Sequence, residues 1–141
     1  IKTFVCNQGK EYMPYSFGLH PYFKVNNLNK LLIRGLSNTC INHLTMLKTS
    51  TENQLSRIAE GIDLLAQSIG PVSLIDLETE QVIEMHNESP MDLAVIWSDP
   101  PRQMICMEPW TSPRQSLING ERRLLLTPGC TQSFACKFVA K

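Results

Sequence analysis

The sequence reads SFGLHPYFKV over residues 16–25, and its side chains alternate in character through this stretch. A period of two is the interval at which the side chains of a β-strand return to the same face. One face carries Phe17, Leu19, Pro21, Phe23 and Val25, and the other carries Ser16, Gly18, His20, Tyr22 and Lys24. We expect the first face to pack on a hydrophobic core, so that His20 points away from it.

Period-two alternation recurs along the chain more often than helical spacing does. Turn signals such as Asp-Pro-Pro, Asn-Gly and Pro-Gly separate the alternating runs. Many short strands at such spacing are typical of an all-β sandwich or barrel. The further strands expected are residues 1–6, 72–75, 81–85, 93–97, 104–108, 124–126 and 134–139.

One helix is expected, over residues 52–59. Thr51 and Gln54 have the spacing of a capping box, apolar side chains recur every three to four residues, and Gly61 is expected to end the helix. The predicted fold class is therefore an antiparallel β-sandwich with one short helix.

The length of 141 residues favours one globular domain spanning residues 1–141. The chain begins at Ile1, inside an expected strand, so we expect a fragment or a processed product. Thirteen basic and thirteen acidic side chains cancel, which argues against nucleic acid or anionic lipid as a partner. No apolar run approaches the roughly 20 residues that span a bilayer, and no export signal is visible. The expected partner is a small neutral molecule or another protein.

The five cysteines are odd in number and lack C-x-x-C spacing, which argues against a zinc site or a disulfide framework. Cys6, Cys106 and Cys136 lie in apolar, strand-like runs, where a free cysteine behaves as a small buried hydrophobe. A reducing cytoplasm is the expected compartment.

Two polar residues stand out because a proline follows each and favours an extended backbone at that point. His20 precedes Pro21, and imidazole is a common proton donor near neutral pH. Glu108 precedes Pro109 in an apolar run, where burying a carboxylate is costly unless it is paired or functional. A hydrogen-bonded structural histidine and a solvent-facing glutamate remain the alternatives.

A third candidate is Asp63, which lies between Ile62 and Leu64. It fits either an exposed position of an amphipathic strand or an acceptor for substrate hydroxyls. His43 and His86 lie in polar stretches and are expected at the surface. No Gly-rich phosphate loop, G-x-S-x-G or H-E-x-x-H motif occurs, which disfavours nucleotide-dependent, serine-hydrolase and zinc-protease chemistry.

Two stretches together resemble the aldose 1-epimerase, or galactose mutarotase-like, family: PYSFGLHPYF at residues 14–23 and CMEPW at residues 106–110. The leucine-rich run before Pro128 and Gly129 is similar to the closing strands of that family. The resemblance implies a supersandwich fold of which residues 1–141 are the C-terminal portion. The family's first half, which supplies a further active-site histidine and an arginine, has no counterpart here.

The resemblance also implies a reaction, the interconversion of the α and β anomers of a hexose or hexose phosphate. His20 would protonate the ring oxygen, Glu108 would remove the proton of the anomeric hydroxyl, and Asp63 would hold sugar hydroxyls. No cofactor or metal is implied. Tyr22 and Trp110 could stack on a pyranose. The alternatives are a non-catalytic carbohydrate-binding β-sandwich and a fragment that is inactive without its N-terminal half.

Overall fold

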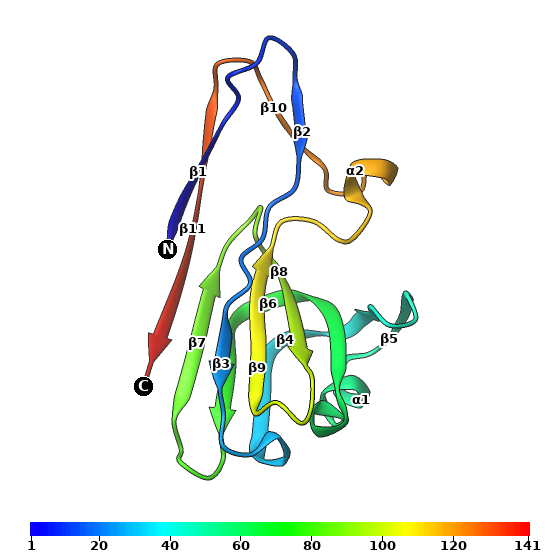
Figure 1. Ribbon diagram of the computed structural model, residues 1–141, viewed down its shortest axis with the longest axis vertical. Helices are drawn as coiled ribbons and strands as arrows, with labels where there is room; N and C mark the ends of the chain where they lie inside the picture. Colours follow the sequence, from blue (N-terminus) through cyan, green and yellow to red (C-terminus); the bar gives the residue numbers. More distant parts are fainter.

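The computed structural model describes residues 1–141 and consists mostly of antiparallel β-strands. Nine strands form one large curled sheet, and two form a small separate sheet at one end of the molecule (Figure 1). The large sheet contains β1 (Lys2–Cys6), β3 (Tyr22–Lys24), β4 (Leu31–Asn42), β5 (Leu47–Ser50), β6 (Ile62–Asp76), β7 (Val82–Asn87), β8 (Leu93–Ser98), β9 (Met104–Trp110) and β11 (Thr131–Ala140), and the small sheet contains β2 (Met13–Tyr15) and β10 (Leu124–Leu126).

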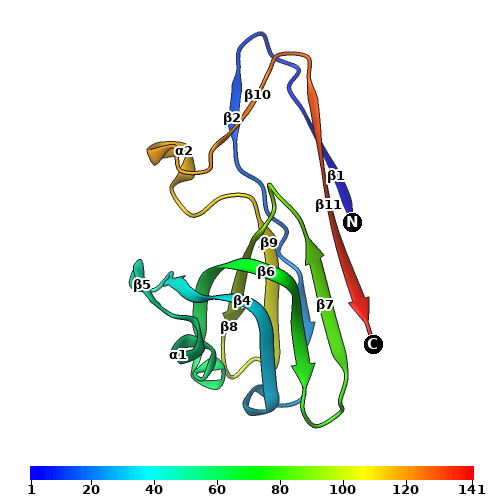
Figure 2. The same ribbon diagram turned by 180° about the vertical axis from the view of Figure 1, so that it is seen from behind.

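The long strand β6 belongs to both halves of the curled sheet. Its first part, from Ile62 to Gln67, pairs with β8, whereas its later part, from Val72 to Ile75, pairs with β7. Figure 2 shows β6 arching across the molecule and then running down beside β7. The curl brings the two halves of the sheet face to face, so one sheet forms both layers around the core.

The core fills the inside of this curl with 21 buried apolar residues. Leu64, Ile96 and Met107 come from one half, and Leu74 and Met85 come from the other. Removing such apolar surface from water is the dominant favourable term in folding. The alternation predicted for residues 16–25 is confirmed, because every second side chain from residue 17 to 25 is buried or half-buried and those between are exposed.

Strand β4 was not predicted, because its apolar residues do not alternate. Ile33, Leu36 and Cys40 are buried at intervals of three and four residues, which resembles a helical pattern. The register between β4 and β6 shifts twice in this stretch, and each irregularity changes the phase of the side chains. Gly35 lies at the first shift with φ +87°, a conformation that favours glycine.

The expected helix at residues 52–59 is wrong in its length and its cap. α1 spans Thr51–Leu55, and a separate 3₁₀ turn spans Ile58–Glu60. The cap is Ser50, whose Oγ accepts a hydrogen bond from the backbone N–H of Asn53 at 3.3 Å. A second short helix, α2 (Ser116–Asn119), had no clear sequence signal. Neither helix has the length and apolar composition needed to cross a membrane.

The cysteines are all free. Cys106 and Cys136 are buried as predicted, but the prediction for Cys6 is wrong because this residue is exposed. Cys6 lies at the end of β1, where every second residue faces solvent.

Candidate active site

His20 and Glu108 lie against each other although they are far apart in the sequence. His20 Nδ1 is 3.1 Å from Glu108 Oε1. The imidazole is largely exposed, whereas only 2% of the glutamate side chain is exposed. An exposed proton carrier therefore touches a buried carboxylate.

The strand register explains this proximity. Tyr22 on β3 pairs with Cys106 on β9, and Gly18 bridges Trp110 farther along the same two segments. His20 lies midway between Tyr22 and Gly18, opposite the residue midway between Cys106 and Trp110, which is Glu108. Alternation along both segments then turns the two side chains to the same face of the sheet.

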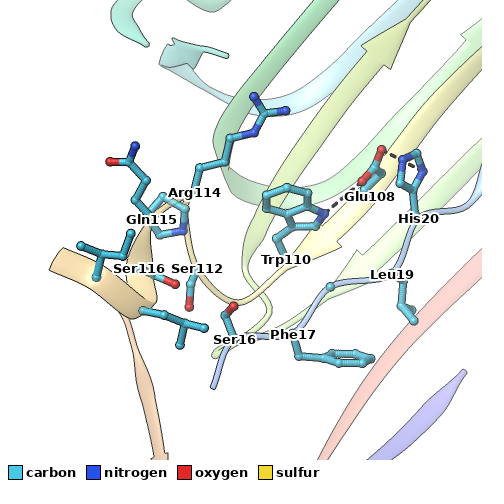
Figure 3. A pocket seen from close by; sticks show the side chains of 14 residues that line it. Ser16, Phe17, Leu19, His20, Glu108, Trp110, Ser112, Arg114, Gln115 and Ser116 are labelled. Carbon is cyan, nitrogen blue, oxygen red and sulfur yellow. Dashed lines mark hydrogen bonds and ion pairs between the residues drawn. The ribbon is translucent and has the colours of Figure 1, made fainter. Parts of the chain in front are cut away.

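Trp110 fixes the second oxygen of the carboxylate. Its indole Nε1–H donates a hydrogen bond to Glu108 Oε2 at 3.0 Å (Figure 3). Burial raises the pKa of Glu108 above its ordinary value, and the opposing effects of His20 and of the Trp110 hydrogen bond are too small to reverse it. The carboxylate is thus a stronger base than an exposed glutamate.

Asp63 lies on β6 and is held by two partners. Its Oδ1 is 2.7 Å from Nδ1 of His43, and its Oδ2 accepts a hydrogen bond from Nη2 of Arg114 at 2.8 Å. Partial burial acts to raise the pKa of Asp63, but the hydrogen bonds and charges of His43 and Arg114 outweigh burial and hold the pKa below its ordinary value. Asp63 therefore stays a carboxylate through the neutral range.

His43 was expected at the surface, and that expectation is wrong. Its side chain is 1% exposed, and its ring packs against Trp110 with 5.9 Å between ring centroids. The backbone N–H of His43 donates to the carbonyl of Asp63 at 2.8 Å. His43 directly follows β4. Because β4 was not predicted, the burial of His43 at its end was not predicted either. His86 is exposed, as predicted.

The face of the sheet that carries Asp63, Trp97, Cys106 and Glu108 is the site face. The register aligns Asp63 with Trp97 on β8, and Trp97 with Cys106 on β9. The His20 ring meets Trp97 edge to face at 5.9 Å. Sequence reasoning did not single out Trp97, because only the pairing of β6, β8 and β9 brings it here.

An open cleft of about 560 Å³ lies at one end of the site face. His20, Glu108, Trp110 and Arg114 line it, together with residues of α2 (Figure 3). Asp63 does not line this cleft but is joined to it through Arg114. The structure therefore brings His20 and Glu108 together, and it connects Asp63 to them indirectly.

This arrangement suits proton transfer on a small polar molecule. A buried carboxylate can accept a proton and an adjacent imidazole can donate one. The aromatic rings offer apolar surface, and Asp63 and Arg114 offer charged hydrogen-bonding groups. His20, Cys106 and Glu108 are also a possible set of metal ligands, since one donor atom from each lies within 4.8 Å of the other two.

Solved structures resemble this chain over nearly its whole length. The Slr1438 protein from Synechocystis sp. PCC 6803 is 25% identical, with a TM-score of 0.90, over 99% of this chain and 49% of its own. A galactose mutarotase-like protein from Clostridium acetobutylicum is 19% identical, with a TM-score of 0.81, over 99% of this chain and 51% of its own. The chain has the galactose mutarotase-like fold.

A third structure with this mutarotase-like fold is a candidate aldose 1-epimerase from Escherichia coli K12. It is 18% identical, with a TM-score of 0.79, over 99% of this chain and 55% of its own. The chain thus spans about half the length of these three solved proteins. No protein-family model and no curated protein matches the sequence.

Proposed function

We propose that this protein is an aldose 1-epimerase-like isomerase that interconverts the α and β anomers of a hexose or a hexose phosphate. In this proposal residues 1–141 are the C-terminal portion of a single mutarotase-like domain. The observation that carries it is the contact between exposed His20 and buried Glu108 at the edge of an open cleft, within this fold.

The chemistry of anomer exchange explains why these two groups must be neighbours. The anomeric hydroxyl and the ring oxygen of a pyranose are bonded to the same carbon, C1. Glu108 takes the proton of the anomeric hydroxyl while protonated His20 gives a proton to the ring oxygen, and the bond between C1 and the ring oxygen breaks. The open aldehyde rotates about the C1–C2 bond, and the reverse proton transfers close the ring on the other face.

Burial of Glu108 supports its role as the base. A general base works best when its pKa approaches the working pH, and desolvation moves a carboxyl group in that direction. The hydrogen bond from Trp110 to Oε2 leaves Oε1, the oxygen that faces His20, as the one available to the sugar.

Asp63 and its neighbours suit the remaining hydroxyls of the sugar. A carboxylate is a strong acceptor for hydroxyl donors, and His43 and Arg114 fix its orientation. The flanking rings of Trp97 and Trp110 offer apolar surface for the C–H face of a pyranose.

The test measures the rate of anomer exchange of α-D-glucose and of α-D-glucose 6-phosphate by NMR exchange spectroscopy. The protein is compared with its Glu108→Gln variant, and Glu121→Gln, which removes an exposed carboxylate, is the matched control. Loss of the base is expected to lower the catalysed rate by about 100-fold or more, whereas Glu121→Gln keeps it. Equal rates in wild type and Glu108→Gln would exclude Glu108 from the mechanism.

A second candidate is a carbohydrate-binding protein without turnover. The observation that favours it is coverage, since the chain matches only 49–55% of the length of the three solved proteins described above. Calorimetric binding of a hexose without any anomer exchange, both in this chain and in one extended by any in-frame upstream coding sequence, would select this candidate.

A further inference from the structure

Cys106 lies beside the His20–Glu108 pair and has no part in the proposed reaction. Cys106 and Glu108 are two residues apart on β9, so both side chains lie on the site face. The Cys106 sulfur, the imidazole nitrogen and a carboxylate oxygen all lie within 4.8 Å of one another. A thiol, an imidazole and a carboxylate therefore converge at one point, although His20 is remote in sequence.

These three groups are the usual protein ligands of zinc. Zinc binds sulfur at about 2.3 Å and nitrogen or oxygen at about 2.0–2.2 Å, so neighbouring ligand atoms of a tetrahedral site lie roughly 3.3–3.7 Å apart. The 3.1 Å between His20 Nδ1 and Glu108 Oε1 is close to this spacing. Small side-chain movements would admit an ion, and three protein ligands would leave a fourth position for water.

Two features of the surroundings favour occupation. The imidazole of His20 is 65% exposed, so it can turn aside to admit an ion to the buried pair behind it. The hydrogen bond from Trp110 to the other carboxylate oxygen orients Glu108, as partners in the second coordination shell of zinc sites commonly do.

The charge balance also permits a cation. Burial and the neighbouring charge of Glu108 raise the pKa of the Cys106 thiol to about 12, so its proton leaves only when a cation takes its place. With the ion bound, the sulfur and the carboxylate together supply two negative charges. Arg102 lies over the Trp97 ring, 5.2 Å from its centroid, and opposes a cation, but its own charge is paired with Asp99.

We propose that His20, Cys106 and Glu108 bind one zinc ion, and that the bound ion blocks anomer exchange by occupying both proton-transfer groups. The Cys106 thiol gives its proton to solvent as the sulfur–zinc bond forms, and no group is oxidised or reduced. Binding of the ion is independent of the sugar chemistry, whereas inhibition rests on the proposed function. The sequence showed no zinc motif, because His20 lies in the segment before β3 whereas Cys106 and Glu108 lie on β9, and ligands so far apart in the chain form no local pattern.

The test is a titration of the metal-free protein with zinc chloride by calorimetry, and with cobalt(II) by absorption spectroscopy. Cobalt bound to a thiolate gives a charge-transfer band that reports the sulfur ligand directly. Cys106→Ser removes the proposed ligand, and Cys136→Ser removes another buried cysteine as a matched control. Circular dichroism establishes that each variant is folded.

One equivalent of zinc is expected to bind wild type and Cys136→Ser with similar affinity. Cys106→Ser is expected to weaken zinc binding at least about tenfold, on the scale of effects seen when zinc sites lose supporting groups, and to lose the cobalt band. If Cys106→Ser does not fold, His20→Ala at the exposed ligand should show the same loss of affinity while keeping the band. Absence of zinc binding to the wild type, or a cobalt band that survives in Cys106→Ser, would overturn the proposal.

Anomer exchange separates this inference from the proposed function. Catalysed exchange without zinc binding would reject the zinc site alone. Zinc binding without any catalysed exchange by the metal-free protein, both in this chain and in the extended chain described above, would reject the enzymatic proposal alone. Where both are present, zinc should inhibit wild type and Cys136→Ser but spare Cys106→Ser, and equal inhibition of all three would reject the assigned ligands.

Discussion

Gly18 and Trp110 pack so closely that no side chain fits between them. A Cβ atom on Gly18 would lie 2.7 Å from Cδ1 of the indole, closer than real Cβ atoms come to other groups. The two residues form an isolated bridge, and the same indole donates the hydrogen bond that orients Glu108. The small size of residue 18 therefore sets the position of Glu108 through Trp110.

Gly18→Ala is expected to displace Trp110 and to destabilise the protein by about 1–3 kcal/mol, as overpacking typically does. Gly70→Ala is the matched control, since a Cβ there meets nothing within 4 Å, and it should be neutral or stabilising by up to about 1 kcal/mol. Urea unfolding, monitored by tryptophan emission, measures the free energy of unfolding of both variants. Equal stability of the two variants would contradict the tight contact.

Both tryptophans of the chain flank the candidate site, so tryptophan emission excited at a wavelength where tyrosine barely absorbs reports on this region. Adding a hexose is expected to change the emission of Trp97 and Trp110 in a saturable way. Asp63→Asn should weaken the affinity by about tenfold or more, since hydrogen bonds to a charged group contribute about 1.5–3 kcal/mol. Hexose binding detected by calorimetry without any change in emission would mean that the sugar binds elsewhere.

Asp63 should also make the stability of the protein depend on pH in the acid range. Its pKa is lower in the folded state than the ordinary value of about 3.9. The unfolded chain therefore takes up the proton first, and the stabilisation is present above about pH 4 and is lost as the pH falls through the folded pKa.

Asp63→Asn is accordingly expected to be less stable than wild type at neutral pH, by about 1–2 kcal/mol. The difference should narrow as the pH falls below about 4, because the wild type then loses the charge that the variant already lacks. Urea unfolding at a series of pH values measures this difference. A gap that stays constant from pH 7 to pH 3 would contradict the assignment.

Any side chain at Gly35 would suffer both backbone strain and a steric clash. Comparison with Gly120, where a side chain would suffer the strain alone, separates the two effects. A Cβ at Gly35 would lie 2.1 Å from the carbonyl oxygen of Pro71, whereas a Cβ at Gly120 meets nothing within 4 Å, although both glycines have positive φ. Gly35→Ala should cost about 3 kcal/mol or more, and Gly120→Ala about 1–2 kcal/mol. Thermal unfolding measures the stability of the two variants. Similar losses of stability would show that backbone conformation alone accounts for the destabilisation.

Local patterns were sufficient for most of the strands. The alternation at residues 16–25 indicates which side chains face the core, and the runs that became β8 and β9 are apolar enough to predict buried strands. They missed the short strands β2 and β5 and the first part of β6, which begins at Ile62 rather than residue 72. They also failed for β4, where two register shifts changed the phase of the buried residues, and for the helix, where Ser50 rather than Thr51 caps the first turn. A bulge depends on the partner strand and a cap depends on a single hydrogen bond. Neither changes the periodicity of the sequence, so periodicity does not predict them.

The sequence by itself determined the β-rich class, the outward direction of His20 and the extended backbone at Glu108, because period-two alternation and the proline after Glu108 act locally. Only the tertiary structure decided that these two residues meet, that His43 is buried against Asp63, and that Cys106 lies within reach of the pair. Those relationships depend on the register between β3 and β9 and on the position of His43 beside β6. Strand register is fixed by packing of the whole sheet, to which residues distant in the sequence contribute.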